Sequence, residues 1–264
     1  TTGASNTAVG MQSLDANTTG SFNTAMGVNA LGDSTTGASL TAVGYAALDK
    51  NTTGDSNTAI GESALGANTT ADNNTAVGVN ALLANTTGNS LVAVGKGALQ
   101  ANTTAVANVA VGVNALEVNT TGDLNIGIGQ NSLSSNTVGD RSIAIGHNTL
   151  QAQNPSSNTD MYNVAIGLNS QFNTTTGVNN TSVGGLTLDA NTTASNNTAF
   201  GYASLSANTT GAGNTGLGTL SLNSNTTASN NTAVGVNALL SNTTGAENTA
   251  IGSFAGDALT TGFS

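Results

Sequence analysis

The sequence predicts an all-β fold, a parallel β-solenoid or β-roll of about fifteen 17-residue coils that forms an elongated rod. A unit written Thr-Thr-Gly-x-x-Asn-Thr-Ala-Val-Gly-x-x-Ala-Leu-x-x-Asn begins at Thr1 and recurs fifteen times. Its length is close to that of one β-coil, whereas a repeated helical hairpin needs about twice as many residues. Only 6% of the residues are charged, and the strictly placed apolar residues argue against disorder. One unbroken repeat therefore predicts a single solenoid domain over residues 1–264.

One unit departs from the regular length. Fourteen units have 17 residues, but the tenth, residues 154–174, has four additional residues within the stretch 155–162. Insertions in repeat proteins loop out on one face, which is often a binding face. Pro155, Met161 and Tyr162 therefore form a candidate contact loop for a neighbouring subunit or a ligand. A tolerated bulge is the alternative.

A short strand is expected in the middle of each unit, which we number 1 to 17 from its first Thr. Position 7 is always β-branched, position 9 is always apolar, and position 10 is always Gly. β-Branched and apolar residues ended by Gly indicate a strand. A Gly in every unit indicates a positive φ or a backbone approach that a Cβ would block. The structural glycines are Gly10, Gly27, Gly44, Gly61, Gly78, Gly95, Gly112, Gly129, Gly146, Gly167, Gly184, Gly201, Gly218, Gly235 and Gly252.

The two faces of this strand differ in side-chain size. Positions 7 and 9 share one face and positions 8 and 10 share the other. We expect the larger residues of position 9, with the Leu of position 14, to fill the interior: Val9, Leu14, Met26, Leu31, Val43, Leu48, Ile60 and Leu65. The small residues of position 8 would leave a smooth outer face on which another sheet packs. This predicted assembly face comprises Ala8, Ala25, Ala42, Ala59 and Ala76.

Asparagines occupy two further fixed positions. Position 6 is Asn in twelve units and position 17 is Asn in eleven. Asn tolerates left-handed backbone, and identical Asn side chains stacked on successive coils form amide ladders. We interpret both positions as corners of the coil. An alternative is N-glycosylation, because Asn17-Thr18-Thr19 and its copies fit the acceptor pattern.

Charge and composition exclude several classes of function. The formal net charge is −10, which disfavours nucleic acid and anionic membranes as partners, and no apolar run is long enough for a membrane span. His147 is the single histidine and is expected to be a solvated surface residue. Scattered acids such as Asp15, Asp49, Asp55, Asp123 and Asp189 are expected to be unpaired and to aid solubility. We therefore expect no enzyme, no cofactor and no metal site.

The run Asn-Thr-Ala-Val-Gly-x-x-Ala-Leu, as in residues 74–82 and 231–239, resembles the Gly-ended strand repeats in the heads of trimeric autotransporter adhesins. It is more similar still to the repeat shafts of bacteriophage tail fibres. The resemblance covers essentially the whole chain, and it implies a β-roll or β-solenoid, commonly a homotrimer, that acts as an extracellular spacer or adhesive stalk.

These observations predict a structural fibre or filament subunit that is extracellular, on a cell surface or part of a virion fibre. Its partners would be other copies of itself, as a homotrimer or an end-to-end filament. An adhesin or tail-fibre shaft that presents a surface to a cell-surface or matrix ligand is the first alternative. Ice binding is the second, because the Thr residues of positions 1 and 2 would form ladders with one of them facing outward.

Overall fold

The computed structural model describes residues 2–262, and its fold is a parallel β-solenoid. It is all-β, with about 14 turns of about 17 residues each, and no helix occurs within the described range. The fold class predicted from the repeat is therefore confirmed. The chain divides into two compact units, Thr1–Gln130 and Asn131–Ser264.

Each unit is built from very short strands. Those of the first unit are β1 (Thr7–Val9), β2 (Thr24–Met26), β3 (Thr41–Val43), β4 (Thr58–Ile60), β5 (Thr75–Val77), β6 (Val92–Val94), β7 (Val109–Val111) and β8 (Ile126–Ile128). Those of the second are β9 (Gly139–Asp140), β10 (Ile143–Ile145), β11 (Thr159–Asp160), β12 (Val164–Ile166), β13 (Thr181–Val183), β14 (Thr198–Phe200), β15 (Thr215–Leu217), β16 (Thr232–Val234) and β17 (Thr249–Ile251).

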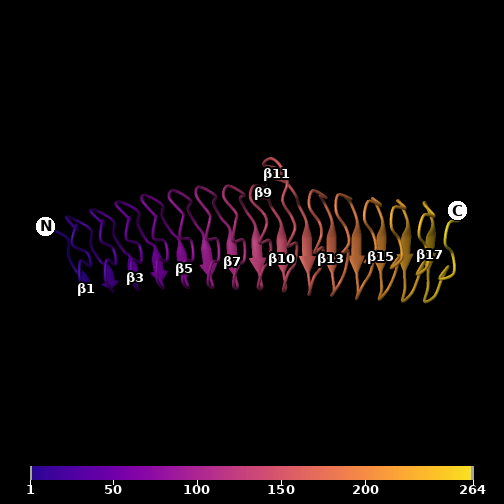
Figure 1. The fold of residues 1–264 in the computed structure, drawn as a ribbon, viewed down its shortest axis with the longest axis horizontal. Helices are drawn as coiled ribbons and strands as arrows, with labels where there is room; N and C mark the ends of the chain where they lie inside the picture. Colours follow the sequence, from indigo (N-terminus) through magenta and orange to yellow (C-terminus); the bar gives the residue numbers. More distant parts are fainter. Residues whose placement is uncertain (1, 263–264) are drawn as a thin grey trace. The chain divides into compact units, whose positions relative to one another are not determined.

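Successive coils within each unit stack in register. The three-residue strands pair in parallel and in chain order, so that position 7 lies beside position 7 of the next coil, as Thr7 does beside Thr24. Figure 1 shows the strands of each unit side by side. The turns between them stack too: the N–H of Leu31 donates to the carbonyl of Ala47 at 3.0 Å, and that of Thr18 to Thr35 at 2.9 Å. Equivalent residues of neighbouring coils therefore form continuous rows.

The strand faces are opposite to the prediction. Ala25, Ala42, Ala59 and Ala76 are fully buried, so position 8 faces the interior and is not an assembly face. Ala8 is exposed, as is the whole of strand β1.

The larger side chains of position 9 point outward instead. Val9, Met26 and Ile60 are 56%, 45% and 41% exposed, and Val43 is half-buried. Their predicted interior location is wrong.

A close wall inside the coil explains this reversal. Position 8 faces position 13 across the interior: the hydroxyls of Ser182 and Ser170 lie 2.5 Å apart. A Cβ added to Gly216, at position 8, would lie 2.5 Å from Oγ of Ser204 and 2.9 Å from Oγ of Ser221, both at position 13. Only small side chains fit between these walls, so the Val or Ile of position 9 must lie outside.

The Leu row of position 14 does fill the interior. Leu31, Leu48 and Leu65 are fully buried, as predicted, while Leu14 in the first coil is half-buried. Leu48 has a φ of 51°, a left-handed conformation that is unusual for a bulky residue. Burial of the side chain and the hydrogen bonds between coils hold this backbone in place.

Buried asparagines complete the interior at the corners. At position 17, Nδ2 of Asn51 donates to the carbonyl of Gly54 at 3.0 Å. At position 6, Oδ1 of Asn57 accepts the N–H of Asn74 at 2.9 Å. The predicted corner role and amide ladders are confirmed, and the ladders satisfy backbone groups that the turns leave unpaired.

Position 10 requires Gly for both of the predicted reasons. Gly61 has a φ of 136°, and a Cβ at this residue would lie 2.5 Å from the carbonyl oxygen of Gly78 in the next coil. The same approach recurs from Gly10 to Gly112 and from Gly146 to Gly235, whereas the last residue of the row, Gly252, has no backbone atom within 4 Å of such a Cβ. Stacked glycines thus set the close contact between coils where each strand ends.

Candidate functional site: the apolar strip

The outward face of the strands carries a row of apolar side chains in every coil. We call the side chains of position 9 in each unit the apolar strip; position 7, on the same face, is Thr in ten units. In-register pairing places each member beside its equivalent in the next strand, as Ile60 lies beside Val77, at the ordinary strand spacing of about 4.8 Å. The strip is therefore periodic as well as apolar.

Position 11, two residues beyond the strip, adds further exposed apolar residues. Tyr45 and Tyr202 are 57% and 56% exposed. Together, the large exposed residues of positions 9 and 11 are Val9, Met11, Met26, Tyr45, Ile60, Val79, Val94, Val113, Ile128, Leu168, Phe200, Tyr202, Val236 and Ile251. Soluble monomers rarely expose apolar residues in contiguous arrays of this kind.

Charged residues avoid the strip. Positions 7 and 9 carry none in any unit, and position 11 carries only Glu62, Lys96 and the single histidine, His147. His147 is exposed, as expected. A face without charge can be removed from water without leaving an unpaired ion behind.

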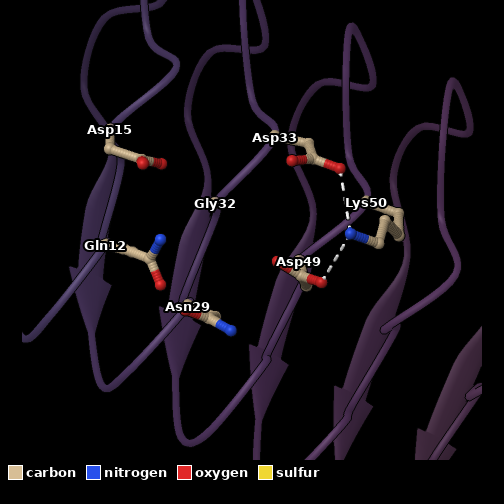
Figure 2. Close-up of a pocket in the computed structure, with 7 residues that line it drawn as sticks. All are labelled: Gln12, Asp15, Asn29, Gly32, Asp33, Asp49 and Lys50. Atoms are coloured by element: carbon tan, nitrogen blue, oxygen red, sulfur yellow. Dashed lines mark hydrogen bonds and ion pairs between the residues drawn. The ribbon is translucent and has the colours of Figure 1, made fainter.

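A small polar hollow lies elsewhere on the first unit. It encloses about 200 Å³ and is lined by Gln12, Asp15, Asn29, Gly32, Asp33, Asp49 and Lys50. In Figure 2, Nζ of Lys50 lies between two of these carboxylates, 3.1 Å from Asp33 and 3.0 Å from Asp49. The expectation that the acids are unpaired is thus wrong for Asp49. Hydrogen bonds to Asp49 and Asp33, with their negative charge, raise the pKa of Lys50.

The hollow is not arranged as a metal site. No group of three or more His, Cys, Asp or Glu side chains in residues 2–262 has a geometry that would hold a metal ion. The hollow's exposed ion pairs contribute little to stability because solvent screens them.

The insertion in the tenth unit is anchored rather than free. It protrudes from its coil in Figure 1, where β11 pairs with β9. Met161 is fully buried and Pro155 is also buried, so two of the three residues predicted as a contact loop face inward. The reason is Gly139: a Cβ there would lie 3.1 Å from both of their side chains, which fill the space above this glycine.

Tyr162 is the exposed member of that loop and belongs to a small polar cluster. Its hydroxyl donates to Oδ2 of Asp160 at 3.2 Å, and the guanidinium of Arg141 lies 6.0 Å from the ring centroid. Arg141 also forms an ion pair with Asp160, and this hydrogen bond raises the pKa of Arg141. The cluster satisfies its own charges.

Any functional inference for this chain rests on its fold and on the apolar strip, because comparison with known proteins gives no relative. No protein-family model matches the chain, and no curated protein matches it. In the described residues, no helix is long and apolar enough to cross a membrane.

The sequence contained one signal for the apolar strip. Positions 8 and 13 are both small in nearly every unit, a pairing that fits two walls in close contact. The large side chains of position 9 predicted an interior location instead. Exposed apolar residues are common on protein surfaces, and only their alignment in rows makes them informative.

Proposed function

We propose that this chain is a structural shaft or filament subunit that self-associates through the apolar strip. The observation that supports this role is that position 9 is exposed or half-buried in every coil, with Ile60 and Phe200 both 41% exposed. Burial of such rows against another surface would stabilise an assembly by roughly 25 cal/mol per Å² of apolar area.

A second copy of the same chain is the partner that fits. Its strip has the same repeat, so the rows of two chains match in spacing within each compact unit. The run Asn74 to Leu82 resembles the shafts of phage tail fibres and the heads of trimeric adhesins, which favours a homotrimer outside the cell. An adhesive role would add a ligand to this assembly.

The oligomeric state tests the proposal. Light scattering after size exclusion is expected to give a multiple of the 25.6 kDa chain mass. The double variant Ile60→Lys/Val94→Lys places charge in the strip and is expected to lower the mass toward one chain. Thr53→Lys/Thr87→Lys is the matched control, since both threonines are exposed at position 2. A wild-type protein that is monomeric at all concentrations would contradict the proposal.

Electron microscopy separates the two forms of assembly. Long fibres in negative stain would favour the filament, whereas discrete trimers that bind a cell or matrix would favour the adhesin. Loss of either form in the Ile60→Lys/Val94→Lys variant would link it to the strip.

Ice binding is the second candidate, supported by the outward Thr row of position 2. Thr19, Thr36 and Thr53 are exposed, whereas at position 1 the hydroxyl of Thr52 donates to the carbonyl of Thr69 at 3.0 Å. Of these two rows, only that of position 2 leaves its hydroxyls available to ordered water. Thermal hysteresis in purified protein tests this candidate, and its absence would eliminate it.

A further inference from the structure

The chain contains two main classes of the Asn-x-Thr acceptor pattern for N-linked sugars. In one class the Asn is at position 17: Asn17, Asn51, Asn68, Asn85, Asn102, Asn119, Asn191, Asn208, Asn225 and Asn242. In the other the Asn is at position 5, within an Asn-Asn-Thr run: Asn73, Asn179, Asn196 and Asn230. The fold treats the two classes differently.

The position 17 asparagines of this class are buried in the folded chain, except Asn17 in the first coil, which is half-buried. Asn68 is fully buried, and its Nδ2 donates to Oδ1 of Asn51 at 2.8 Å and to the carbonyl of Ala71 at 3.1 Å. A sugar on this nitrogen would occupy the interior of the coil and remove one of its two hydrogens from the ladder.

The position 5 asparagines are accessible. Asn73, Asn179, Asn196 and Asn230 are all exposed, with φ angles of 59°, 58°, 63° and 60°. Each stands at the outer corner that precedes a strand. Their side-chain amides form no hydrogen bond within the described residues.

The Thr of the Asn-x-Thr pattern also lies on the outer side of the coil. The Thr two residues after each of these asparagines is the first residue of a strand, for example Thr75 in β5, and it is half-buried on the outward face. Three further strands repeat this arrangement: β13 (Thr181–Val183), β14 (Thr198–Phe200) and β16 (Thr232–Val234).

We propose that Asn73, Asn179, Asn196 and Asn230 are acceptor sites for an N-linked oligosaccharide. The donor class is a lipid-linked oligosaccharide diphosphate. Nδ2 would attack the anomeric carbon of the first sugar, forming the N–C bond while the bond from that carbon to the phosphate oxygen breaks. The lipid diphosphate leaves with the electron pair, and the proton of Nδ2 passes to a base of the transferase. None of the four asparagines belongs to the apolar strip, so the proposal does not rest on self-association through it.

Two other matches to the pattern are not included. Asn180 is fully buried. Asn173 is exposed, but its Nδ2 donates to the carbonyl of Asp189 at 2.8 Å. Exposure and an unengaged amide coincide only at position 5.

Site-resolved modification of the folded protein tests the proposal. Purified full-length chain is incubated with an oligosaccharyltransferase and a lipid-linked oligosaccharide, and each Asn is assigned by glycopeptide mass spectrometry. Occupancy of Asn73 is expected to exceed that of Asn68 by at least about tenfold, because Asn68 reacts only when its coil opens. A synthetic peptide of residues 64–78 presents both asparagines outside the fold and is expected to lose this preference.

Two variants complete the design. Thr75→Val keeps a β-branched residue in β5 and is expected to abolish modification of Asn73 alone. Ser56→Asn creates an Asn-Asn-Thr run at an exposed position 5, where φ is 56°, and is expected to add one glycan. Equal modification of Asn68 and Asn73 in the folded chain, or modification of neither, would overturn the proposal.

Discussion

Nδ2 of Asn68 donates a hydrogen bond of 2.8 Å to Oδ1 of Asn51, the equivalent residue one coil earlier. Asn85 repeats this bond to Asn68 at 3.1 Å, and Asn102 repeats it to Asn85 at 2.8 Å. Each amide is thus donor to one neighbour and acceptor from the other. The ladder passes through the interior of the coils and joins them by side chains as well as by backbone.

The ladder is interrupted at Ser34 and Leu259 of position 17, whereas Gln153 continues it by donating from Nε2 to Oδ1 of Asn136 at 3.2 Å. Oδ1 of Asn17 and Oδ1 of Asn242 are buried without a hydrogen-bond partner, because the next residues in the row are Ser34 and Leu259. The unpaired oxygens at these two breaks lie where the following residue of the row gives them no hydrogen bond.

We predict that Asn68→Ala lowers the free energy of unfolding by about 2–4 kcal/mol, because it removes two donated bonds and leaves buried partners unsatisfied. Chemical denaturation followed by circular dichroism measures this. Asn73→Ser is the control: Asn73 is exposed, and its replacement is expected to change stability by less than about 0.5 kcal/mol. Equal effects of the two substitutions would refute a stabilising role for the ladder.

Gly61→Ala is expected to destabilise the fold by at least about 3 kcal/mol, because the added Cβ meets a backbone carbonyl and φ is positive. Gly66→Ala is the matched control: its Cβ would approach no backbone or side-chain atom closer than 3.2 Å. The difference between the two denaturation midpoints is the measurement. If both variants unfold at the wild-type midpoint, the glycines of neighbouring coils do not lie as close together as described above.

Adjacent residues in β4 provide a test of which strand face lies inside. Ala59→Val adds volume between two close walls and is expected to cost about 1–3 kcal/mol, as overpacking does. Ile60→Thr changes an outward side chain and is expected to cost less than about 1 kcal/mol in the monomer. Thermal unfolding of dilute samples measures both, and the reverse order of stability would restore the original assignment of the faces.

Asp189 predicts a pH dependence. Burial raises the pKa of this carboxyl above its ordinary 3.8, and its Oδ1 is buried without a hydrogen-bond partner. The folded chain therefore holds the proton to higher pH than the unfolded chain does. Its contribution to stability is complete below pH 3.8 and is lost as the pH rises through the raised value.

Asp189→Asn is accordingly expected to stabilise the fold at pH 7 by less than about 1 kcal/mol, since partial exposure screens the charge. Denaturation of both proteins across the acidic range measures the effect. The advantage of the variant should shrink as the pH falls below the raised pKa. A variant that is less stable than the wild type at neutral pH would show that the ionised carboxylate of Asp189 does not destabilise the fold.

The sequence alone was sufficient for the elements whose role follows from the backbone. A fixed period predicted the coil, and the invariant Gly61 predicted a positive φ and a close approach because no other residue tolerates both. Leu48 was assigned to the interior correctly. Asn57 and Asn51 were assigned to corners because Asn suits turns and stacks in rows.

Only the tertiary structure decided what each coil encloses. Alternation along β4 divides its residues between two faces, but alternation does not say which face is inside. The distance to the opposite wall decided that Ala59 lies inside and Ile60 outside. The same holds for Met161, which is buried because Gly139 leaves space for it, and for Lys50, which meets Asp33 only because coils stack. Local residue preferences set the turns and strands, whereas burial depends on the volume between walls that are distant in the chain.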